Sequence, residues 1–500
     1  MGSRAGWFFG RLISIAAMVS AALLLSTVYA AKMFPTRYLA AAGAVCAVLL
    51  VLITVLTWNT KSKARFIIGI ILGLLITAAG LMGTAYLRKT VVTAKSITKT
   101  KAEVSQVGVY VNASNNDDFD SAAGSYTYGI VSAVDRKSTD QAWEKLQEDY
   151  NPSEDPKEYD SLPQLVDALR KDKVKAILMN TAFVDVLSEM DGFDKIDEEI
   201  KLVKTYDVET QVDKAEQDTD RINSGKNGDT FAMYISGIDT RSSQISAKSR
   251  SDVNIIAVVN TKTHQILLVS TPRDYYVPLS VSGGAKDKLT HAGIYGIQCS
   301  MDTLSSIYDM DLDYYFKVNF TGFENIIDAL GGVTVHSDYD FSVKGYHFTQ
   351  GDNNVDGKAA LVFARERHAF KEGDNQRGKN QMAMIKAVIS KMMSADMLKN
   401  YSSVLNAMEG SFETSMPYDK ISSLVKDQLE SAAGWNIVSY SATGTGSQAV
   451  PYSMSQQAYV MIPDQASIET AKKMIEQVYD GEIVSEDAAA QTEAETGSAQ

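Results

Sequence analysis

Three long stretches near the start of the chain contain no charged residue, and they constrain its fold more than any other feature. They run over residues 12–31, 39–58 and 66–86 and hold 20, 20 and 21 residues. A helix of about 20 apolar residues spans the hydrocarbon core of a bilayer. Basic residues lie in both gaps, which favours membrane spans over three successive buried core helices. The sequence therefore predicts three transmembrane helices within residues 1–90.

The basic residues also predict the orientation of these helices. They flank the first stretch on its N-terminal side and fill the gap between the second and third: Arg4, Arg11, Lys61, Lys63 and Arg65. Such flanks resist translocation and stay in the cytoplasm. We therefore expect a multi-pass cell-membrane protein whose C-terminal domains are extracellular. Alternatively, the first stretch is a signal peptide cleaved before Ala31, which leaves the same part of the chain outside.

Composition excludes several classes of function. The 500 residues, 45% of them hydrophobic, suffice for two or three folded domains. Lys plus Arg number 48 and Asp plus Glu 61, so the net charge of −13 opposes binding to nucleic acid. Two cysteines, Cys46 and Cys299, cannot build a disulfide framework or a cysteine metal site. No two of the five histidines have the i, i+4 spacing of a zinc-binding helix.

Beyond the membrane spans, the sequence predicts an α/β protein with two external domains. Residues 91–105 are polar and indicate a stalk. Short β-rich runs alternate with helical patterns over 106–212, which predicts a small accessory α/β domain, and 213–228 is typical of a linker. Residues 229–482 combine apolar strands with later helices, which predicts a mixed β-sheet covered by helices. The tail over 483–500 has a composition typical of disorder.

Polar residues concentrate at the ends of the first three predicted strands of the C-terminal domain. They are Asp239 and Arg241 after the first, Arg250 and Asp252 before the second, and Arg273 and Asp274 after the third. Strand ends of α/β sheets converge on one edge, where such folds bind ligands. Paired carboxylates suit Mg²⁺ or Mn²⁺, and arginine forks match phosphate oxygens. Salt bridges and loop caps along the edge are the alternative.

A second charged cluster lies within residues 364–381. Arg365 and Arg367 are two apart, so an extended segment would point both guanidinium groups the same way. Asp374, Arg377 and Gln381 are spaced by three and four residues and would share one face of a helix. Because converging arginines repel one another, this pattern favours an anion site over a generic charged helix start.

Six successive motifs resemble the signatures of the LytR-CpsA-Psr family. They are GIDTR, SRSD, STPRD, KLTHA, DYYFKVNFTGFENIIDALGGV and FARERHAFKEGDNQRGKNQ, between residues 237 and 381. The resemblance is strong over about 229–393 and extends to about residue 480. The three spans and the accessory domain are similar to the capsule-associated branch of this family in Gram-positive bacteria.

The resemblance implies an extracellular phosphotransferase. Such enzymes attach a glycopolymer, either a capsular polysaccharide or a teichoic-acid-like polymer, from undecaprenyl pyrophosphate to peptidoglycan, and pyrophosphatase side activity and capsule assembly partners are also expected. The implied metal ligands for Mg²⁺ or Mn²⁺ are Asp239 and Asp252. The implied pyrophosphate and pocket residues are Arg250, Arg273, Arg365, Arg367, Asp374, Arg377 and Gln381, with Arg241 also assigned to substrate. Some relatives have a further arginine shortly after the PRD motif, where this chain has Tyr275 to Val277, and family patterns often have arginine where it has Asn380.

Three alternatives stay open at this level. Phe320, Phe323, Ile327 and Leu330 recur at helical spacing, so they could line a slot for the isoprenoid tail or form an ordinary core stripe. The sequence does not identify the general base; Asp274 and Asp374 are candidates, and each could instead orient an arginine. A noncatalytic regulator or scaffold of polysaccharide assembly, which only senses lipid-linked sugar, is the rival function.

Overall fold

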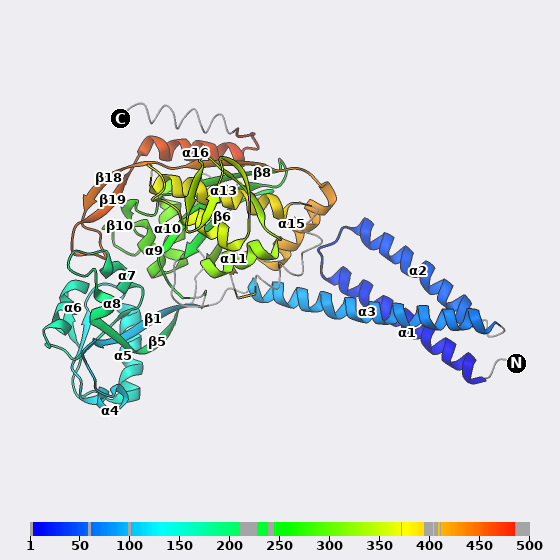
Figure 1. Cartoon of the computed structure of the whole chain (residues 1–500), viewed down its shortest axis with the longest axis horizontal. Helices are drawn as coiled ribbons and strands as arrows, with labels where there is room; N and C mark the ends of the chain where they lie inside the picture. Colours follow the sequence, from blue (N-terminus) through cyan, green and yellow to red (C-terminus); the bar gives the residue numbers. More distant parts are fainter. Residues whose placement is uncertain are drawn as a thin grey trace. The chain divides into compact units, whose positions relative to one another are not determined.

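The structure, a computed structural model, describes residues 4–58, 62–98, 102–210, 228–238, 245, 247–371, 373–394, 404, 409–410 and 412–485. The chain forms two compact units. The first combines residues 1–99 with 398–409 and 416–434, and the second comprises 100–397, 410–415 and 435–500. Figure 1 shows the helices and strands of both units.

The helices of the first unit whose bounds the structure describes are three long apolar ones and a shorter one from late in the chain. They are α1 (Arg4–Ala30), α2 (Thr36–Trp58), α3 (Lys63–Ile97) and α15 (Tyr418–Ser431). The first three are long and apolar enough to cross a membrane. Helix α3 passes the boundary expected at residue 90, so the first part of the predicted stalk, residues 91–97, is helical, and residues 103–105 already belong to a strand. The helix continues because Val91 and Ala94 pack against Met33 and Tyr418.

Helix α15 packs against the connection between α1 and α2. The Tyr418 hydroxyl donates to the Ala31 carbonyl at 2.9 Å. The Arg37 guanidinium donates to the carbonyls of Leu429, at 2.9 Å, and Glu430, at 3.1 Å. These carbonyls lie in the last turn of α15, where no helical donor remains for them. Arg37 therefore caps the C-terminal end of this helix.

The second unit begins with the accessory domain, residues 103–210, a five-stranded sheet in the order β3-β2-β4-β1-β5. Its strands are β1 (Glu103–Asn112), β2 (Tyr128–Val131), β3 (Lys157–Tyr159), β4 (Ala176–Asn180) and β5 (Ile200–Thr210). Its helices are α4 (Phe119–Ala122), the 3-10 turn η1 (Ala123–Ser125), α5 (Arg136–Tyr150), α6 (Leu162–Arg170), α7 (Phe183–Ser188) and α8 (Ile196–Glu199). Residues of α5 pack on one face of the sheet and those of α6 and α7 on the other, so both faces are covered.

The C-terminal domain, residues 228–485 of the second unit, is built on a six-stranded mixed sheet. The order β16-β11-β6-β7-β8-β17 combines parallel pairs, β11 with β6 and β8 with β17, and antiparallel pairs. The strands are β6 (Thr230–Ile238), β7 (Ser251–Asn260), β8 (Gln265–Ser270), β11 (Tyr314–Asn319), β16 (Phe412–Thr414) and β17 (Asn436–Ser441). The expected mixed sheet is confirmed.

Helices cover this sheet, as the sequence predicts. They are α9 (Leu289–Tyr295), α10 (Ile297–Tyr308), α11 (Phe320–Ala329), α12 (Gly357–Arg365), α13 (Asp374–Met392) and α16 (Gln465–Tyr479). The main core joins α10 and α16 to the sheet through residues such as Leu304, Ile475 and Tyr234. Short two-stranded sheets decorate the domain: β9 (Tyr276–Pro278) with β10 (Lys286–Lys288), β12 (Val333–Ser337) with β15 (Gly351–Val355), β13 (Phe341–Val343) with β14 (Tyr346–Phe348), and β18 (Gly444–Ala449) with β19 (Ala458–Pro463).

The strand register brings several strand ends to one edge of the mixed sheet. Ile238, which ends β6, pairs with Ser251, which begins β7. Asn319, at the end of β11, also pairs with Ile238. Ser441, at the end of β17, pairs with Ser270, at the end of β8. Segments far apart in the sequence therefore leave the sheet side by side, which is the arrangement that the polar strand ends predict.

The accessory and C-terminal domains share buried contacts. Lys317 of β11 donates from Nζ to Glu103 Oε1 of β1 at 2.9 Å, and the Ile297 amide donates to Glu103 Oε2 at 2.9 Å. Ile294, Met454 and Ala458 of the C-terminal domain join the apolar core of the accessory domain.

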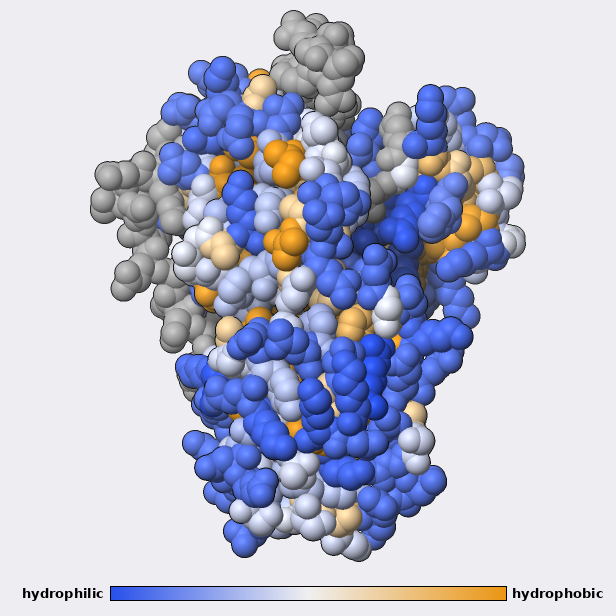
Figure 2. Space-filling view, turned by 90° about the vertical axis from the view of Figure 1, so that its left-hand side faces the viewer, coloured by the Kyte–Doolittle hydropathy of each residue, from blue (hydrophilic) through white to orange (hydrophobic). Residues whose placement is uncertain are grey.

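The face shown in Figure 2 is mostly hydrophilic, with apolar residues in small groups.

Candidate active site at the edge of the mixed sheet

A cavity of about 240 Å³ opens at the sheet edge where the strand ends meet. Four residues that the sequence assigns to the site line it: Asp252, Arg273, Arg377 and Gln381. Other lining residues, among them Asn254, Ser270, Lys379 and Thr443, were not predicted. They belong to the same strand ends and to helix α13, which covers these ends. The polar character of the strand ends was therefore the sequence feature that could have identified them.

Asp252 and Arg273 form the ion pair beside this cavity. Arg273 Nη1 donates to Asp252 Oδ1 at 3.1 Å, and the two side chains are 16% and 14% exposed. Thr290 Oγ1 donates to the same oxygen at 3.4 Å. The pair meets because Thr271, just after β8, still donates from its backbone to Asn254 of β7 at 2.8 Å. The next residues of the β8 segment therefore stay beside the start of β7.

The charge around Asp252 is strongly positive. Burial raises the pKa of the Asp252 carboxyl, but the charges of Arg273, Arg250 and Arg377 outweigh burial and hold this pKa below its ordinary value. Arg377 lies four residues before Gln381 on α13, and both line the cavity. Arg377 and Gln381, two of the three residues that the sequence places on one helix face, therefore both face the cavity.

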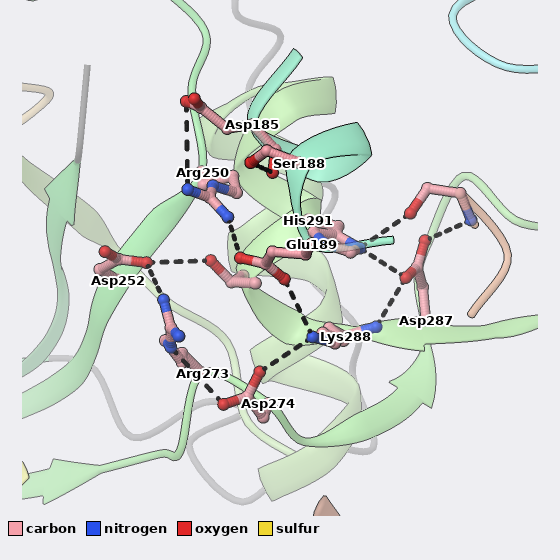
Figure 3. A network of polar contacts seen from close by, with 12 residues as sticks. Asp185, Ser188, Glu189, Arg250, Asp252, Arg273, Asp274, Asp287, Lys288 and His291 are labelled. Atoms are coloured by element: carbon pink, nitrogen blue, oxygen red, sulfur yellow. Dashed lines mark hydrogen bonds and ion pairs between the residues drawn. The ribbon is translucent and has the colours of Figure 1, made fainter. Parts of the chain in front are cut away.

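A chain of ion pairs extends from Arg273 toward the accessory domain, as Figure 3 shows. Arg273 Nε lies 3.5 Å from Asp274 Oδ2, and Lys288 Nζ lies 3.5 Å from Asp274 Oδ1. Lys288 Nζ also donates to Glu189 Oε2 at 3.2 Å. Asp274 thus lies between two cations, Arg273 and Lys288.

Arg250 points toward the accessory domain. Its Nη1 donates to Glu189 Oε1 and its Nη2 lies 4.0 Å from Asp185 Oδ2. Within the described part of the chain, Arg250 contacts these two carboxylates and does not line the cavity. Asp185 and Glu189 were not predicted, although their i, i+4 spacing, from the first turn of α7 to its C-cap, places two carboxylates on one face.

The neighbouring cations keep the Glu189 carboxyl group ionised. Burial raises the pKa of its carboxyl, but the charges of Lys288 and Arg250 overcome burial and lower the pKa to about 2. Glu189 is therefore an anion at neutral pH, and the network around the cavity alternates in sign.

The second predicted cluster is only partly brought to this cavity. Arg365 ends α12 and Glu366 has extended backbone, so the two arginines do not share one extended segment as expected. Both side chains are exposed, and among the described residues neither lines the cavity. Instead, the Arg365 guanidinium lies 4.2 Å from the centre of the Phe320 ring. Arg367 Nε donates to His368 Nε2 at 3.3 Å.

Some predicted residues lie outside the described residues. These are Asp239 and Arg241, which follow β6, and the side chain of Asp374, whose backbone begins α13. Among the residues that the structure does describe, no three Asp, Glu, His or Cys side chains form a metal cluster.

The predicted apolar stripe divides into two pairs. Ile327 and Leu330 are fully buried and belong to the core, as an ordinary core stripe requires. Phe320 and Phe323 are only partly buried, and Phe320 carries the Arg365 contact. The part of the stripe that remains accessible to a ligand is therefore the pair of phenylalanines.

Comparison with known proteins extends these findings. The model of the LytR_cpsA_psr family matches residues 198–476, more than half of the chain. The chain is 31% identical to the polyisoprenyl-teichoic acid–peptidoglycan teichoic acid transferase TagU of Enterococcus faecalis, over 44% of the chain and 75% of that protein. It is 30% identical to TagU of Bacillus subtilis, over 48% and 77%. The crystal structure of B. subtilis TagV is 25% identical and aligns with a TM-score of 0.43, over 51% of the chain and 98% of TagV.

Proposed function

Because the chain belongs to the LytR_cpsA_psr family, we propose that it transfers a glycopolymer from a polyprenyl-pyrophosphate carrier to peptidoglycan. The relatives named TagU are teichoic acid transferases that act on a polyisoprenyl-linked polymer and peptidoglycan. One observation carries the proposal for this chain: Asp252, Arg273 and Arg377 converge on one cavity at the sheet edge. A pyrophosphate is a ligand whose charge and shape match such a set.

The residues support phosphoryl transfer through positioning and charge. An acceptor hydroxyl of peptidoglycan attacks the phosphorus next to the glycopolymer, the bond from that phosphorus to the bridging oxygen breaks, and polyprenyl phosphate leaves. Little covalent help from the protein is needed, because catalysis rests on alignment and on neutralising charge on phosphate oxygens. Arg273 and Arg377 supply guanidinium donors for these oxygens, and Asp252 holds Arg273 in place.

We propose Asp239 and Asp252 as the ligands of Mg²⁺ or Mn²⁺. Both hydrogen bonds that Asp252 makes with described residues use Oδ1, so the carboxylate would still have lone pairs for a cation. The low pKa of Asp252 keeps the carboxylate ionised, as metal binding requires. When bound, the metal would neutralise charge on the pyrophosphate oxygens.

The proposed carrier has a long isoprenoid tail. Binding this tail requires an apolar surface next to the cavity. Phe320 and Phe323, which are partly exposed, are the residues that we assign to this contact. Arg365, stacked on Phe320, would then lie where the tail meets the phosphates.

Packing within the first unit supports an extracellular site. Helix α15, late in the sequence, contacts the connection between α1 and α2. That connection and α15 therefore lie on the same side of a membrane, whereas α1 begins with basic residues on the other side. We propose that the cavity faces the cell wall and that the protein is multi-pass.

The test uses the full chain in detergent micelles with Mg²⁺, a polyprenyl-pyrophosphate-linked oligosaccharide and peptidoglycan. We expect release of polyprenyl phosphate together with covalent attachment of the oligosaccharide. Substrates carrying capsular repeats and teichoic acid repeats, compared side by side, identify the polymer. Tight binding without release or transfer would reject the enzyme and favour a noncatalytic sensor or scaffold of polysaccharide assembly.

A further inference from the structure

Glu189 belongs to the accessory domain, yet its carboxylate binds two cations of the candidate site. Oε1 accepts from Arg250 Nη1, and Oε2 accepts from Lys288 Nζ at 3.2 Å. One carboxylate thus bridges a residue that precedes β7 and a residue that precedes α9. Figure 3 shows Glu189 between the two, with Asp185 on the far side of Arg250.

The bridge continues to the cavity through alternating charges. Lys288 Nζ lies 3.5 Å from Asp274, and Asp274 lies 3.5 Å from Arg273 Nε. Arg273 in turn donates to Asp252 at 3.1 Å. The position of Glu189 is therefore linked to Arg273 and Asp252, which both line the cavity.

Packing holds Glu189 in place. It directly follows α7, where Phe183, Val186 and Leu187 are buried in a core that also contains Ile294 of α9. The Phe183 ring meets Tyr295 of α9 edge-on, with ring centroids 6.5 Å apart. Helices α7 and α9 are thus joined by an apolar contact as well as by the ion pair at Lys288, which precedes α9.

The Glu189 carboxylate compensates the charges of two buried cations. The side chains of Arg250 and Lys288 are only 11% and 6% exposed. Two buried cations repel each other and move toward solvent unless an anion lies between them. Asp185, at 4.0 Å from Arg250, is too distant to replace the direct contact with Glu189.

We propose that Glu189 is a positioning residue for glycopolymer transfer, so that the accessory domain completes the active site of the C-terminal domain. The inference rests on the proposed function. Glu189 acts through Arg250 and Lys288, and through Asp274 it aligns Arg273 with the substrate phosphates.

The experiment compares Glu189→Gln with Glu199→Gln in the full chain. Glu199 is a matched control because it forms a Glu–Arg pair inside the accessory domain, accepting from Arg170 Nε at 2.8 Å. We expect Glu189→Gln to lower kcat for transfer by roughly tenfold or more, since small misplacements near the reacting atoms have large effects on rate. KM should change by less than about threefold, because Glu189 itself does not touch substrate. Glu199→Gln should keep the kcat of the wild type.

A double variant separates positioning from general destabilisation. If Glu189 acts through Arg250, then Glu189→Gln combined with Arg250→Gln should lose no more activity than the worse single variant. Glu189→Asp, which keeps the charge, should recover part of the lost kcat.

Two results would overturn the inference while leaving the proposed function intact. One is a kcat for transfer in Glu189→Gln that equals the kcat of the wild type. The other is a higher kcat in that variant, which would make Glu189 a competitor of the substrate phosphates for Arg250 and Lys288. A wild-type chain without transfer in the same assay would reject the proposed function, and this inference with it.

Discussion

Asp252 stands at the end of the described network that lines the cavity. It accepts hydrogen bonds from Arg273 and Thr290 and is surrounded by the charges of three arginines. Nearly buried carboxylates are costly unless cations compensate them. Asp252 and the arginines therefore stabilise each other, and the same arrangement prepares the arginines for an anionic ligand.

The first prediction concerns this carboxylate. Asp252→Asn keeps the shape of the side chain but removes the charge that holds Arg273 and that we assign to a metal. We expect transfer to slow by about 10² to 10³, roughly 3 kcal/mol in activation free energy, the magnitude for loss of one preorganised charge contact. Rates of polyprenyl phosphate release measure it. Asp352→Asn, in an exposed carboxylate paired with His336, is the control and should keep wild-type rates. Normal transfer by Asp252→Asn would contradict the assignment.

The second prediction concerns the pH dependence of stability. The pKa of Glu189 is lowered from 4.5 to about 2 in the folded protein, so its contribution is fully present above the unfolded pKa and is lost as the pH falls toward 2. The shift corresponds to at most about 3 kcal/mol, less after allowance for partial exposure. Melting temperatures of wild type and Glu189→Gln should therefore differ most at pH 6 to 7 and converge between about pH 4 and pH 2. A constant difference in melting temperature across this pH range would show that the ion pairs do not lower the pKa of Glu189.

At the scale of elements, the close approach of α9 to the start of β7 organises the site. A Cβ at Gly293 of α9 would lie 2.4 Å from the backbone oxygen of Ser249 and 3.0 Å from the Ser251 nitrogen. Only glycine allows this approach, since backbone atoms cannot move aside as a flexible side chain can. The approach places Thr290 beside Asp252 and Lys288 beside Glu189.

The third prediction tests this contact. Gly293→Ala should push α9 away from β7, lower the free energy of unfolding by about 1–3 kcal/mol and reduce transfer as well. Thermal unfolding and release rates measure the two effects. The control is Gly434→Ala, because no atom lies within 4 Å of a Cβ at that position. Equal behaviour of the two variants would mean that α9 and β7 are not in tight contact.

At the scale of the whole molecule, the membrane helices decide which side of the bilayer the cavity faces. The fourth prediction is that a phosphatase reporter fused after Gln500, active only outside the cytoplasm, gives a positive signal in cells. Three crossings from a cytoplasmic N-terminus require this result. A reporter in the connection between α2 and α3, residues 59–62, serves as the opposite control and should be inactive. The reverse pattern would contradict the proposed orientation.

Much of the fold could be predicted because it depends on local patterns. Apolar stretches of 20 or 21 residues define the membrane helices, and short apolar runs with charged residues at one end define β6, β7 and β8. Strand pairing then brings Asp252 and Arg273 together, since both lie at the ends of neighbouring strands. The end of α3 was missed because Ala94 stays helical through contacts with Met33 and Tyr418, which no local pattern reveals.

The sequence by itself determined the membrane spans and the mixed sheet, and it placed Asp252 and Arg273 at strand ends on one edge of that sheet, because hydrophobic periodicity is a property of neighbouring residues. Only the tertiary structure decided that Glu189 meets Arg250, 61 residues later, and that Tyr418 meets Ala31, 387 residues earlier. Contacts at such separations depend on how completed elements pack, and the residue types involved are the same ones that cover any solvated surface. The accessory domain therefore has no recognisable catalytic pattern in its sequence, although its folded form places a carboxylate among the site arginines.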